Sequence, residues 1–266
     1  MARVRLDDEL VAQGLCADCD EALRILMEGR VSSGGERLTS PGLKVEPGLE
    51  LHVKGRSPYV GRGGIKLEGA LDACGVDPAG RSCVDIGCST GGFTDCLLKH
   101  GAASVLAVDV GRAQFDWGLR NDPRVTLLER TNIVDVPAMG YGGMFDLAVC
   151  DVSFTSIRNI LPAVLRLLAP GGLFLTLVKP QFEAAPTDVG EGGVVRDPAV
   201  RARALADVIA LFDASGLAPL RACASPIAGA KGNREFFLLG VLDAPGADVR
   251  PLDELTHELL KEAEAL

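Results

Sequence analysis

From Arg81 onward, short apolar runs alternate with amphipathic stretches. A short apolar run predicts a buried strand, and apolar residues three or four positions apart predict a helix. The predicted strands are Cys83–Ile86, Ser104–Val108, Val125–Leu128, Leu147–Cys150 and Leu173–Val178, and the predicted helices lie near Gly92–Lys99, Ala113–Arg120, Ile157–Leu168 and Ala199–Ser215. Strands joined through helices lie parallel in one sheet, with helices on both faces. The pattern therefore predicts an α/β domain.

Two further apolar runs lie near the end of the chain. Leu217–Ala224 and Glu235–Val241 follow each other with no helical stretch between them. A short connection of this kind favours antiparallel pairing, because a parallel pair needs a long crossover. We therefore expect the sheet to close with an antiparallel strand.

Residues 1–54 predict a small domain of mixed α and β structure. Leu6–Gln13 and Asp18–Glu28 have apolar residues at helical spacing, and Asp18 is suited to cap the second helix. Short strands are expected at the apolar positions that follow, among Gly, Ser and Pro turns: Val31, Leu38, Val45 and Leu49–Val53. This pattern is separate from the one that begins at Arg81, so we expect two hydrophobic cores.

Composition changes mark the borders between these parts. Residues 55–64 are rich in glycine and basic, which predicts a linker between the small domain and a larger one over residues 65–243. Residues 244–266 form an acidic tail that we expect to be helical.

The chain has a net charge of −9, which argues against a protein that coats nucleic acid without specificity. Part of this acidity comes from the tail, and the basic linker remains.

Some classes of protein are disfavoured by what the sequence lacks. No apolar run approaches the length of a membrane helix, and the first ten residues have no signal-peptide core, so we expect a cytoplasmic protein. Cys16 and Cys19 form the one CxxC motif, but no second pair stands at zinc-ligand spacing. We expect reduced cysteines, no metal, no membrane partner and a monomer.

A glycine-rich turn follows the first strand of the larger domain. It runs Asp85-Ile86-Gly87-Cys88-Ser89-Thr90-Gly91-Gly92-Phe93. The carboxyl ends of parallel strands are where open α/β sheets bind ligands, and glycine lets the backbone approach a ligand closely. By itself the turn is compatible with nucleotide binding, methyl transfer or a purely structural role.

The second strand discriminates between these alternatives. It ends at Asp109, and an acid at this place is suited to accept hydrogen bonds from two ribose hydroxyls. The turn does not match the GxGxxG pattern that binds a pyrophosphate, whereas S-adenosylmethionine has no phosphate and carries an ammonium that Asp85 could hold. Methyl transfer is therefore favoured. Asn132 and Ile133, after the third strand, are suited to bracket the adenine, although a plain loop cap stays possible.

An acid and a lysine follow the next two strands. Asp151 follows the fourth strand and Lys179 follows the fifth, beside the expected sulfonium. An unpaired buried ammonium is costly, which makes a lysine at the end of a buried strand informative. Lys66 precedes the first strand and Glu235 opens the last one. Alternatively, these four residues form two ion pairs that only stabilise the fold.

These four residues, Lys66, Asp151, Lys179 and Glu235, resemble the Lys-Asp-Lys-Glu tetrad of FtsJ-like RNA 2′-O-methyltransferases. The chain is more closely similar to the TlyA (hemolysin A) family, from about Val4 to Leu239. This likeness rests on the segments around the tetrad, the glycine-rich turn and Gly193-Val194-Val195-Arg196-Asp197-Pro198. The resemblance implies a Rossmann-like class I methyltransferase sheet and a small N-terminal α+β RNA-binding domain. It also implies methylation of a cytidine 2′-hydroxyl in small- or large-subunit ribosomal RNA.

The motifs, the distribution of basic residues and the resemblance together assign roles to particular residues. The four tetrad residues would be catalytic, with Lys179 as the base, Asp151 and Glu235 orienting the lysines, and Lys66 positioning the hydroxyl or a phosphate. S-adenosylmethionine would contact Asp85, Gly87, Ser89, Thr90, Gly91, Gly92, Phe93, Asp109, Asn132, Ile133 and Asp151. Ribosomal RNA or a ribosomal subunit would contact Arg3, Arg5, Arg24, Arg30, Lys54, Arg56 and Arg62.

The N-terminal module departs from the family pattern. Asp18-Cys19 stands where the module usually has a Ser-Arg pair, which keeps a helix cap but removes a phosphate contact, and Gly61 stands where the family often has Ser. We therefore expect the basic linker to carry more of the RNA affinity than the first helices. Competing functions are a pore-forming hemolysin, an RNA-binding ribosome-assembly factor without catalysis, and a methyltransferase of proteins or small molecules.

Overall fold

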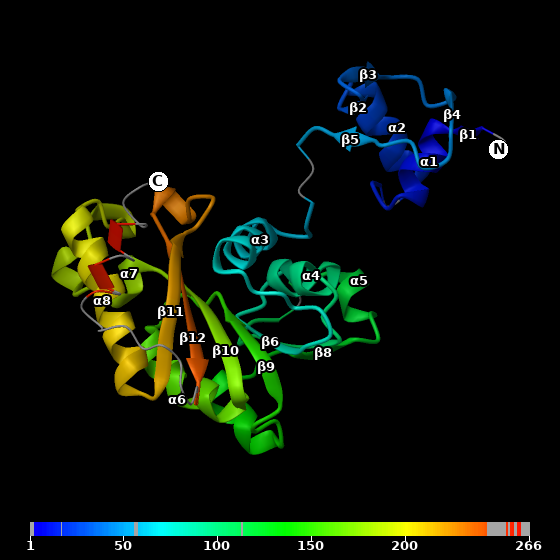
Figure 1. Cartoon of the computed structure of the whole chain (residues 1–266). Coiled ribbons are helices and arrows are strands. Elements are labelled where there is room, and N and C mark those ends of the chain that lie inside the picture. Colours follow the sequence, from blue (N-terminus) through cyan, green and yellow to red (C-terminus); the bar gives the residue numbers. More distant parts are fainter. Residues whose placement is uncertain are drawn as a thin grey trace. The chain divides into compact units, whose positions relative to one another are not determined.

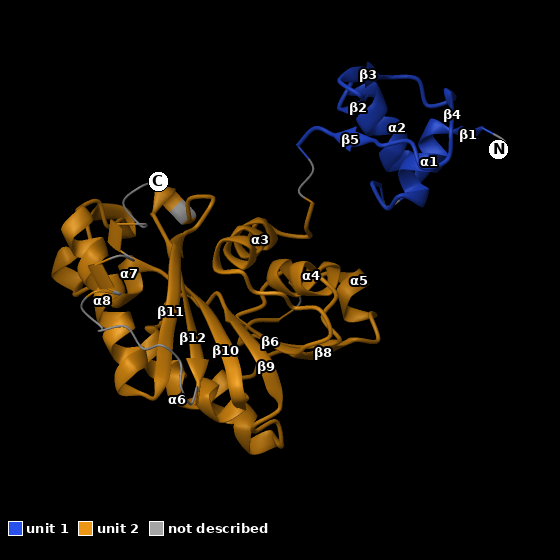
Figure 2. Ribbon diagram, in the orientation of Figure 1, with its two compact units in different colours: residues 1–57 blue, residues 58–266 orange. Residues whose placement is uncertain are grey.

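The computed structural model describes residues 3–16, 18–55, 58–112 and 114–243, together with residues 254, 256–257 and 260–261. Arg56, the beginning of the helix expected near Ala113 and most of the acidic tail over residues 244–266 lie outside the described residues. The chain divides into two compact units, Met1–Ser57 and Pro58–Leu266 (Figure 1; Figure 2). Each unit has its own hydrophobic core and is described by itself.

The first unit packs two helices on short strands. The helices are α1 (Leu6–Ala12) and α2 (Cys19–Met27), and the strands are β1 (Val4–Arg5), β2 (Val31–Ser33), β3 (Glu36–Leu38), β4 (Lys44–Val45) and β5 (His52–Val53). β1 pairs with β4, and the other three form a sheet in the order β3-β2-β5. Asp18 caps α2, since its side chain accepts a hydrogen bond of 2.8 Å from the backbone N–H of Glu21. The expected mixed α and β fold is confirmed.

The second unit contains a seven-stranded sheet. Its strands are β6 (Ser82–Ile86), β7 (Ser104–Val108), β8 (Val125–Leu128), β9 (Phe145–Cys150), β10 (Leu168–Val178), β11 (Leu217–Ala224) and β12 (Phe236–Leu242), in the order β11-β12-β10-β9-β6-β7-β8. The pairs among β6 to β10 are parallel, whereas β12 lies antiparallel between β10 and β11. This is the expected Rossmann-like methyltransferase sheet, closed by an antiparallel strand.

Helices cover both faces of this sheet (Figure 1). One face carries α3 (Arg62–Cys74), α4 (Gly92–Lys99) and α5 (Trp117–Arg120), and the other carries α6 (Ile157–Leu167) and α8 (Pro198–Ala214). Short helical turns complete the unit: η1 (Ile133–Met139), α7 (Pro180–Glu183), η2 (Pro186–Asp188), η3 (Glu191–Gly193) and η4 (Ala230–Gly232). Residues of β6 alternate between the two cores, with Val84 and Ile86 in one and Cys83 in the other. Such alternation follows from the pleat of a strand.

The structure differs from the sequence-based borders around residue 65. A linker over residues 55–64 was expected, but α3 begins at Arg62 and Tyr59 is only 6% exposed. The backbone N–H of Val60 donates a 2.9 Å hydrogen bond to Asp95 Oδ2. A Cβ on Gly64 would lie 2.1 Å from Cγ of Tyr59, so this glycine permits close packing. The glycines that suggested a flexible segment therefore hold α3 tightly in place.

All eight cysteines are free, and only Cys19 is exposed. No helix in the described part of the chain is long and apolar enough to cross a bilayer.

The revised border can be tested with two truncated chains. A chain that begins at Pro58 keeps the buried Tyr59 ring and the first turn of α3, so we expect it to unfold cooperatively in urea. A chain that begins at Ile65 loses both, and we expect it to be less stable by about 2–4 kcal/mol. Equal unfolding midpoints for the two chains would show that residues 58–64 act as a linker after all.

Candidate active site

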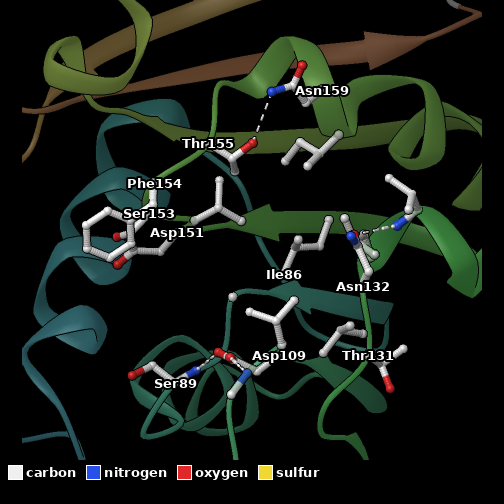
Figure 3. Close-up of a pocket in the computed structure, with 18 of the residues that line it drawn as sticks. Ile86, Ser89, Asp109, Thr131, Asn132, Asp151, Ser153, Phe154, Thr155 and Asn159 are labelled. Atoms are coloured by element: carbon white, nitrogen blue, oxygen red, sulfur yellow. Dashed lines mark hydrogen bonds between the residues drawn. The ribbon is translucent and has the colours of Figure 1, made fainter.

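A cavity of about 480 Å³ opens at the carboxyl ends of the parallel strands, within the size range of ligand pockets of about 300–1,000 Å³. The order of the sheet reverses between β6 and β9, and such a switch point is the usual ligand site of an open α/β sheet. Gly87 follows β6, Asp109 follows β7 and Asp151 follows β9, and all three line the cavity. Figure 3 shows Asp109 and Asp151 in its wall. Three separate strand ends therefore meet at one site.

Asp109 has a fixed orientation in this cavity. Its Oδ2 accepts a 2.7 Å hydrogen bond from the backbone N–H of Ser89, and its Oδ1 accepts a 2.6 Å bond from the N–H of Gly111 (Figure 3). Each carboxylate oxygen has a further lone pair, so both can still accept from a ligand hydroxyl. The geometry thus suits two neighbouring hydroxyls of a ribose.

The cavity continues past Asp109 to the start of η1. Asn132 caps this turn through a 3.2 Å hydrogen bond from the N–H of Val134 to its Oδ1 (Figure 3). Ile133 is 5% exposed and lines the cavity, so it offers an apolar surface for a flat ring. Both residues line the cavity, and Asn132 has the capping role that was the alternative to an adenine contact.

Some residues of the glycine-rich turn line the cavity and others do not. Gly87 and Ser89 line the cavity, and a Cβ on Gly87 would lie 2.7 Å from the carbonyl oxygen of Asp151, so a side chain at 87 would disturb the cavity wall. The remaining four residues of the turn expected to contact the cofactor do not line it: Thr90, Gly91, Gly92 and Phe93. Phe93 is 3% exposed and stacks on Phe237 with ring centroids 6.1 Å apart. Phe93 therefore belongs to the core.

Asp85 is fully buried and does not line the cavity. The hydroxyl of Thr94 donates a 2.6 Å hydrogen bond to its Oδ2, and its Oδ1 has no hydrogen-bond partner among the described residues. Burial raises the pKa of Asp85 to about 7; the hydrogen bond from Thr94 opposes the rise, and the charge of Asp151 adds to it. A buried carboxyl of this kind would be stabilised in its charged form by a ligand cation.

The four expected catalytic residues form two ion pairs. Lys179 Nζ lies 2.5 Å from Asp151 Oδ1 and donates a 2.9 Å hydrogen bond to the hydroxyl of Ser153. Lys66 Nζ lies 2.5 Å from Glu235 Oε2. Both lysines are 8% exposed. Because buried charges are stable only when paired, each acid stabilises its lysine.

The residues of these ion pairs lie at the ends of neighbouring strands and on one helix. β9, β10 and β12 are adjacent in the sheet, and Asp151, Lys179 and Glu235 flank their ends at the edge where the cavity opens. Lys66 comes from α3, a helix that the sequence did not predict. Asp151 belongs both to an ion pair and to the cavity wall, so the pair with Lys179 lies beside the cavity.

Sequence reasoning missed several residues of this wall. Ser153, Thr155 and Asn159 line the cavity, and Phe154 beside them is 92% exposed (Figure 3). Phe154 has φ 64°, a conformation uncommon for a bulky residue, and its ring lies 5.5 Å from that of Phe182. Phe154 belonged to a segment that carried the family resemblance, but no chemistry of the motif indicated its exposure.

The described cations expected to contact RNA divide between the units. Arg3, Arg5, Arg24, Arg30 and Lys54 belong to the first unit and Arg62 belongs to the second. Arg5, Arg24 and Arg30 each form an ion pair with a nearby carboxylate. Arg62 donates a 3.0 Å hydrogen bond to the carbonyl oxygen of Ala228, in the loop that leads to Glu235. Among the described residues, no group of three or more His, Cys, Asp or Glu side chains could hold a metal ion.

The sheet order, the acid after β7 and the cavity at the switch point define an enzyme of the Rossmann-like methyltransferase class. The sequence pattern of the FtsJ-like methyltransferase family matches residues 59–241. The chain belongs to this family and, through relatives that it matches over nearly its whole length, to its TlyA (hemolysin A) group.

Two relatives and one solved structure illustrate the likeness. The chain is 41% identical to the 16S/23S rRNA (cytidine-2′-O)-methyltransferase TlyA of Mycobacterium tuberculosis, over 98% of each chain. It is 44% identical to YqxC of Bacillus subtilis, provisionally described as an rRNA methyltransferase, over 98% of this chain and 96% of that one. A solved structure from Streptococcus thermophilus, provisionally described as a hemolysin, has a TM-score of 0.71 and 39% identity over 100% of this chain and 98% of that one.

The buried Asp85 predicts a pH dependence of stability. Its pKa in the folded chain, about 7, lies above the unfolded value of 3.8, so between these values the folded chain keeps a proton that the unfolded chain has lost. Rising pH therefore favours unfolding over this interval. Relative to Asp85→Asn, which cannot ionise, the wild type should lose up to about 1.4 kcal/mol of unfolding free energy per pH unit.

This loss should level off above about pH 7, the folded-state pKa of Asp85. Urea unfolding of both proteins without ligand at several pH values measures it. Parallel pH profiles for wild type and Asp85→Asn would show that the carboxyl titrates alike in the folded and unfolded chains.

Proposed function

We propose that this enzyme transfers a methyl group from S-adenosylmethionine to a cytidine ribose 2′-hydroxyl in small- or large-subunit ribosomal RNA. The Mycobacterium tuberculosis relative is named for this reaction on both 16S and 23S RNA. The single observation that carries the proposal is the Lys179–Asp151 ion pair, whose acid also lines the cavity at the switch point. A lysine thus lies beside the site suited to a nucleoside cofactor, and its amine accepts a proton once the ammonium of the ion pair has lost its own.

The cavity fits the cofactor by its own chemistry. Asp109 would hold the ribose hydroxyls, and Asn132 and Ile133 would bracket the adenine. Gly87 has no side chain and so leaves room for the methionine part of the cofactor. The unpaired Oδ1 of Asp85 is the group available to stabilise the ammonium, through rearrangement of the turn that covers it. When bound, S-adenosylmethionine supplies an activated methyl group on a sulfonium.

The chain's own residues would align the acceptor and remove its proton. Methyl transfer gains most from a hydroxyl that is held in line and deprotonated as it attacks. Lys179 is the base, and Asp151 and Ser153 hold its amine at the cavity edge. Glu235 orients Lys66, whose ammonium would position the 2′-hydroxyl or the adjoining phosphate.

The first unit would hold the RNA. It carries Arg3, Arg5, Arg24, Arg30 and Lys54, and Arg56 follows them in the sequence. Because phosphate contacts position a nucleic acid, these cations and Arg62 would set the register of the RNA relative to the catalytic edge. One chain contains both parts, so a monomer would suffice. The proposed substrate also implies action in the cytoplasm.

Asp109→Ala tests the cofactor site. The variant loses two charged acceptors for the ribose, so we expect S-adenosylmethionine to bind more weakly by about 1.5–3 kcal/mol in calorimetry. Asp116→Ala is the matched control, since Asp116 also accepts from two backbone N–H groups but does not line the cavity. Equal affinities of the two variants would remove Asp109 from the proposed role.

Two substitutions of Lys179 test the chemistry. Lys179→Ala should abolish transfer of labelled methyl to ribosomal RNA while cofactor affinity stays near normal, because the base acts on the acceptor. Lys179→Arg keeps a cation for Asp151, but a guanidinium does not deprotonate in proteins, so it should also be inactive. Activity in Lys179→Arg would mean that the ion pair is structural and that another group takes the proton.

A further inference from the structure

Two chain segments hold the proposed base at the catalytic edge. One is the loop over residues 151–156, which follows β9, and the other begins at Lys179 and continues through α7. From the loop, Asp151 forms the ion pair with the amine of Lys179, and Ser153 accepts a hydrogen bond from it. The position of this amine therefore depends on how the loop is held against α7.

Side chains join the two segments beyond the end of the sheet. The last ladder pair of β9 and β10 joins Cys150 with Thr176. Past this pair, the contact farthest along both segments is made by Glu183 on α7. Its Oε2 accepts a 2.6 Å hydrogen bond from the hydroxyl of Ser156, and its Oε1 accepts a 2.9 Å bond from the N–H of Ile157. One carboxylate thus bridges α7 and the start of α6.

This bridge fixes the first turn of α6. The first backbone N–H groups of a helix have no acceptor within the helix, so outside groups must satisfy them. Ser156 caps α6 by accepting a 3.1 Å hydrogen bond from the N–H of Arg158, while its own hydroxyl donates to Glu183. The helix dipole also favours a negative charge at this end. Glu183 therefore orients the cap as well as the helix start.

The loop between β9 and α6 contains a residue in an unfavourable conformation. Phe154 has φ 64°, which a bulky residue keeps only where its surroundings hold it. The beginning of the loop is fixed by a 2.9 Å hydrogen bond from the N–H of Asp151 to the carbonyl oxygen of Ile86. Glu183 fixes the other end. Without this second anchor the turn would relax, and Ser153 would leave its place beside the proposed base.

Glu183 itself does not face the ligand sites of this edge. It lines neither the cavity proposed for the cofactor nor a neighbouring cavity of about 620 Å³, which Phe154 and Phe182 line. Any effect of Glu183 on the reaction therefore passes through the groups that it holds.

We propose that Glu183 is a positioning residue for methyl transfer. By bridging α7 to the start of α6, it holds the loop in the conformation in which Asp151 and Ser153 orient the amine of Lys179. Alignment of the proton acceptor with the attacking hydroxyl governs the rate of transfer. This inference rests on the proposed function and adds a residue that acts on the base from outside the cavity.

The test compares the purified full-length wild type with Glu183→Met, using saturating labelled S-adenosylmethionine and ribosomal RNA. Methionine is similar in size but accepts neither hydrogen bond. We expect kcat, corrected for the folded fraction from urea unfolding, to fall at least about tenfold, as when a distant change misplaces a catalytic group. The affinity for S-adenosylmethionine should stay near that of the wild type, because Asp109 and Ile133 follow other strands.

Two further variants separate positioning from stability. Glu183→Gln keeps an oxygen for the N–H of Ile157 and offers an amide N–H to the oxygen of Ser156, so it restores the bridge without the charge and should keep most of kcat. Asp116→Ala removes a carboxylate that also accepts from two N–H groups at a helix start. It should lower the urea midpoint and leave kcat of the folded enzyme unchanged.

The outcomes that contradict the inference are distinct. A wild-type kcat in Glu183→Met, or an equally large fall in Glu183→Gln, would overturn it. If Glu183→Met does not fold, Ser156→Ala replaces it, because this variant removes one of the two bonds to Glu183 and should also lower kcat; an unchanged kcat would again overturn the inference. If the wild type transfers no methyl to ribosomal RNA, the proposed function itself fails, and this inference fails with it.

Discussion

The ion pair between Lys179 and Asp151 is the interaction on which the arrangement of the candidate active site depends. Two lysines lie almost fully buried at one edge of a sheet, and a buried ammonium is tolerated only when an acid compensates it. Lys179 and Asp151 follow neighbouring parallel strands, so the pair forms only if β9 and β10 keep their observed register. The insertion of antiparallel β12 beside β10 brings Glu235 to the same edge for Lys66.

Close backbone packing makes this edge possible. A Cβ on Gly87 would lie 2.7 Å from the carbonyl oxygen of Asp151, and one on Gly229 would lie 2.0 Å from Oε1 of Glu235. Gly64 lets Tyr59 pack against α3, the helix that carries Lys66. The glycines near the site thus act less as hinges than as points where two segments come closer than a side chain would allow.

The regular part of the fold could be predicted because its signals are local. β7, β8 and β11 have the predicted bounds, since each is a mostly apolar run. α3 was missed because its first turn, Arg62-Gly63-Gly64, has the composition of a linker, and its helical geometry depends on packing against Tyr59 and α4. Asp109, Asp151, Lys179 and Glu235 could be located from strand ends, and Lys66 from the family resemblance. Phe93 was expected to contact the cofactor, and its place in the core could not be predicted because burial depends on the tertiary structure.

The central claim is that the edge built on Lys179 methylates ribose hydroxyls of ribosomal RNA. Mapping of 2′-O-methyl groups in the ribosomal RNA of three strains tests it most directly: one with the intact gene, one without it, and one with the Lys179→Ala allele. We predict that at least one cytidine is methylated in the first strain and unmethylated in the other two. Identical maps in all three strains would contradict the claim.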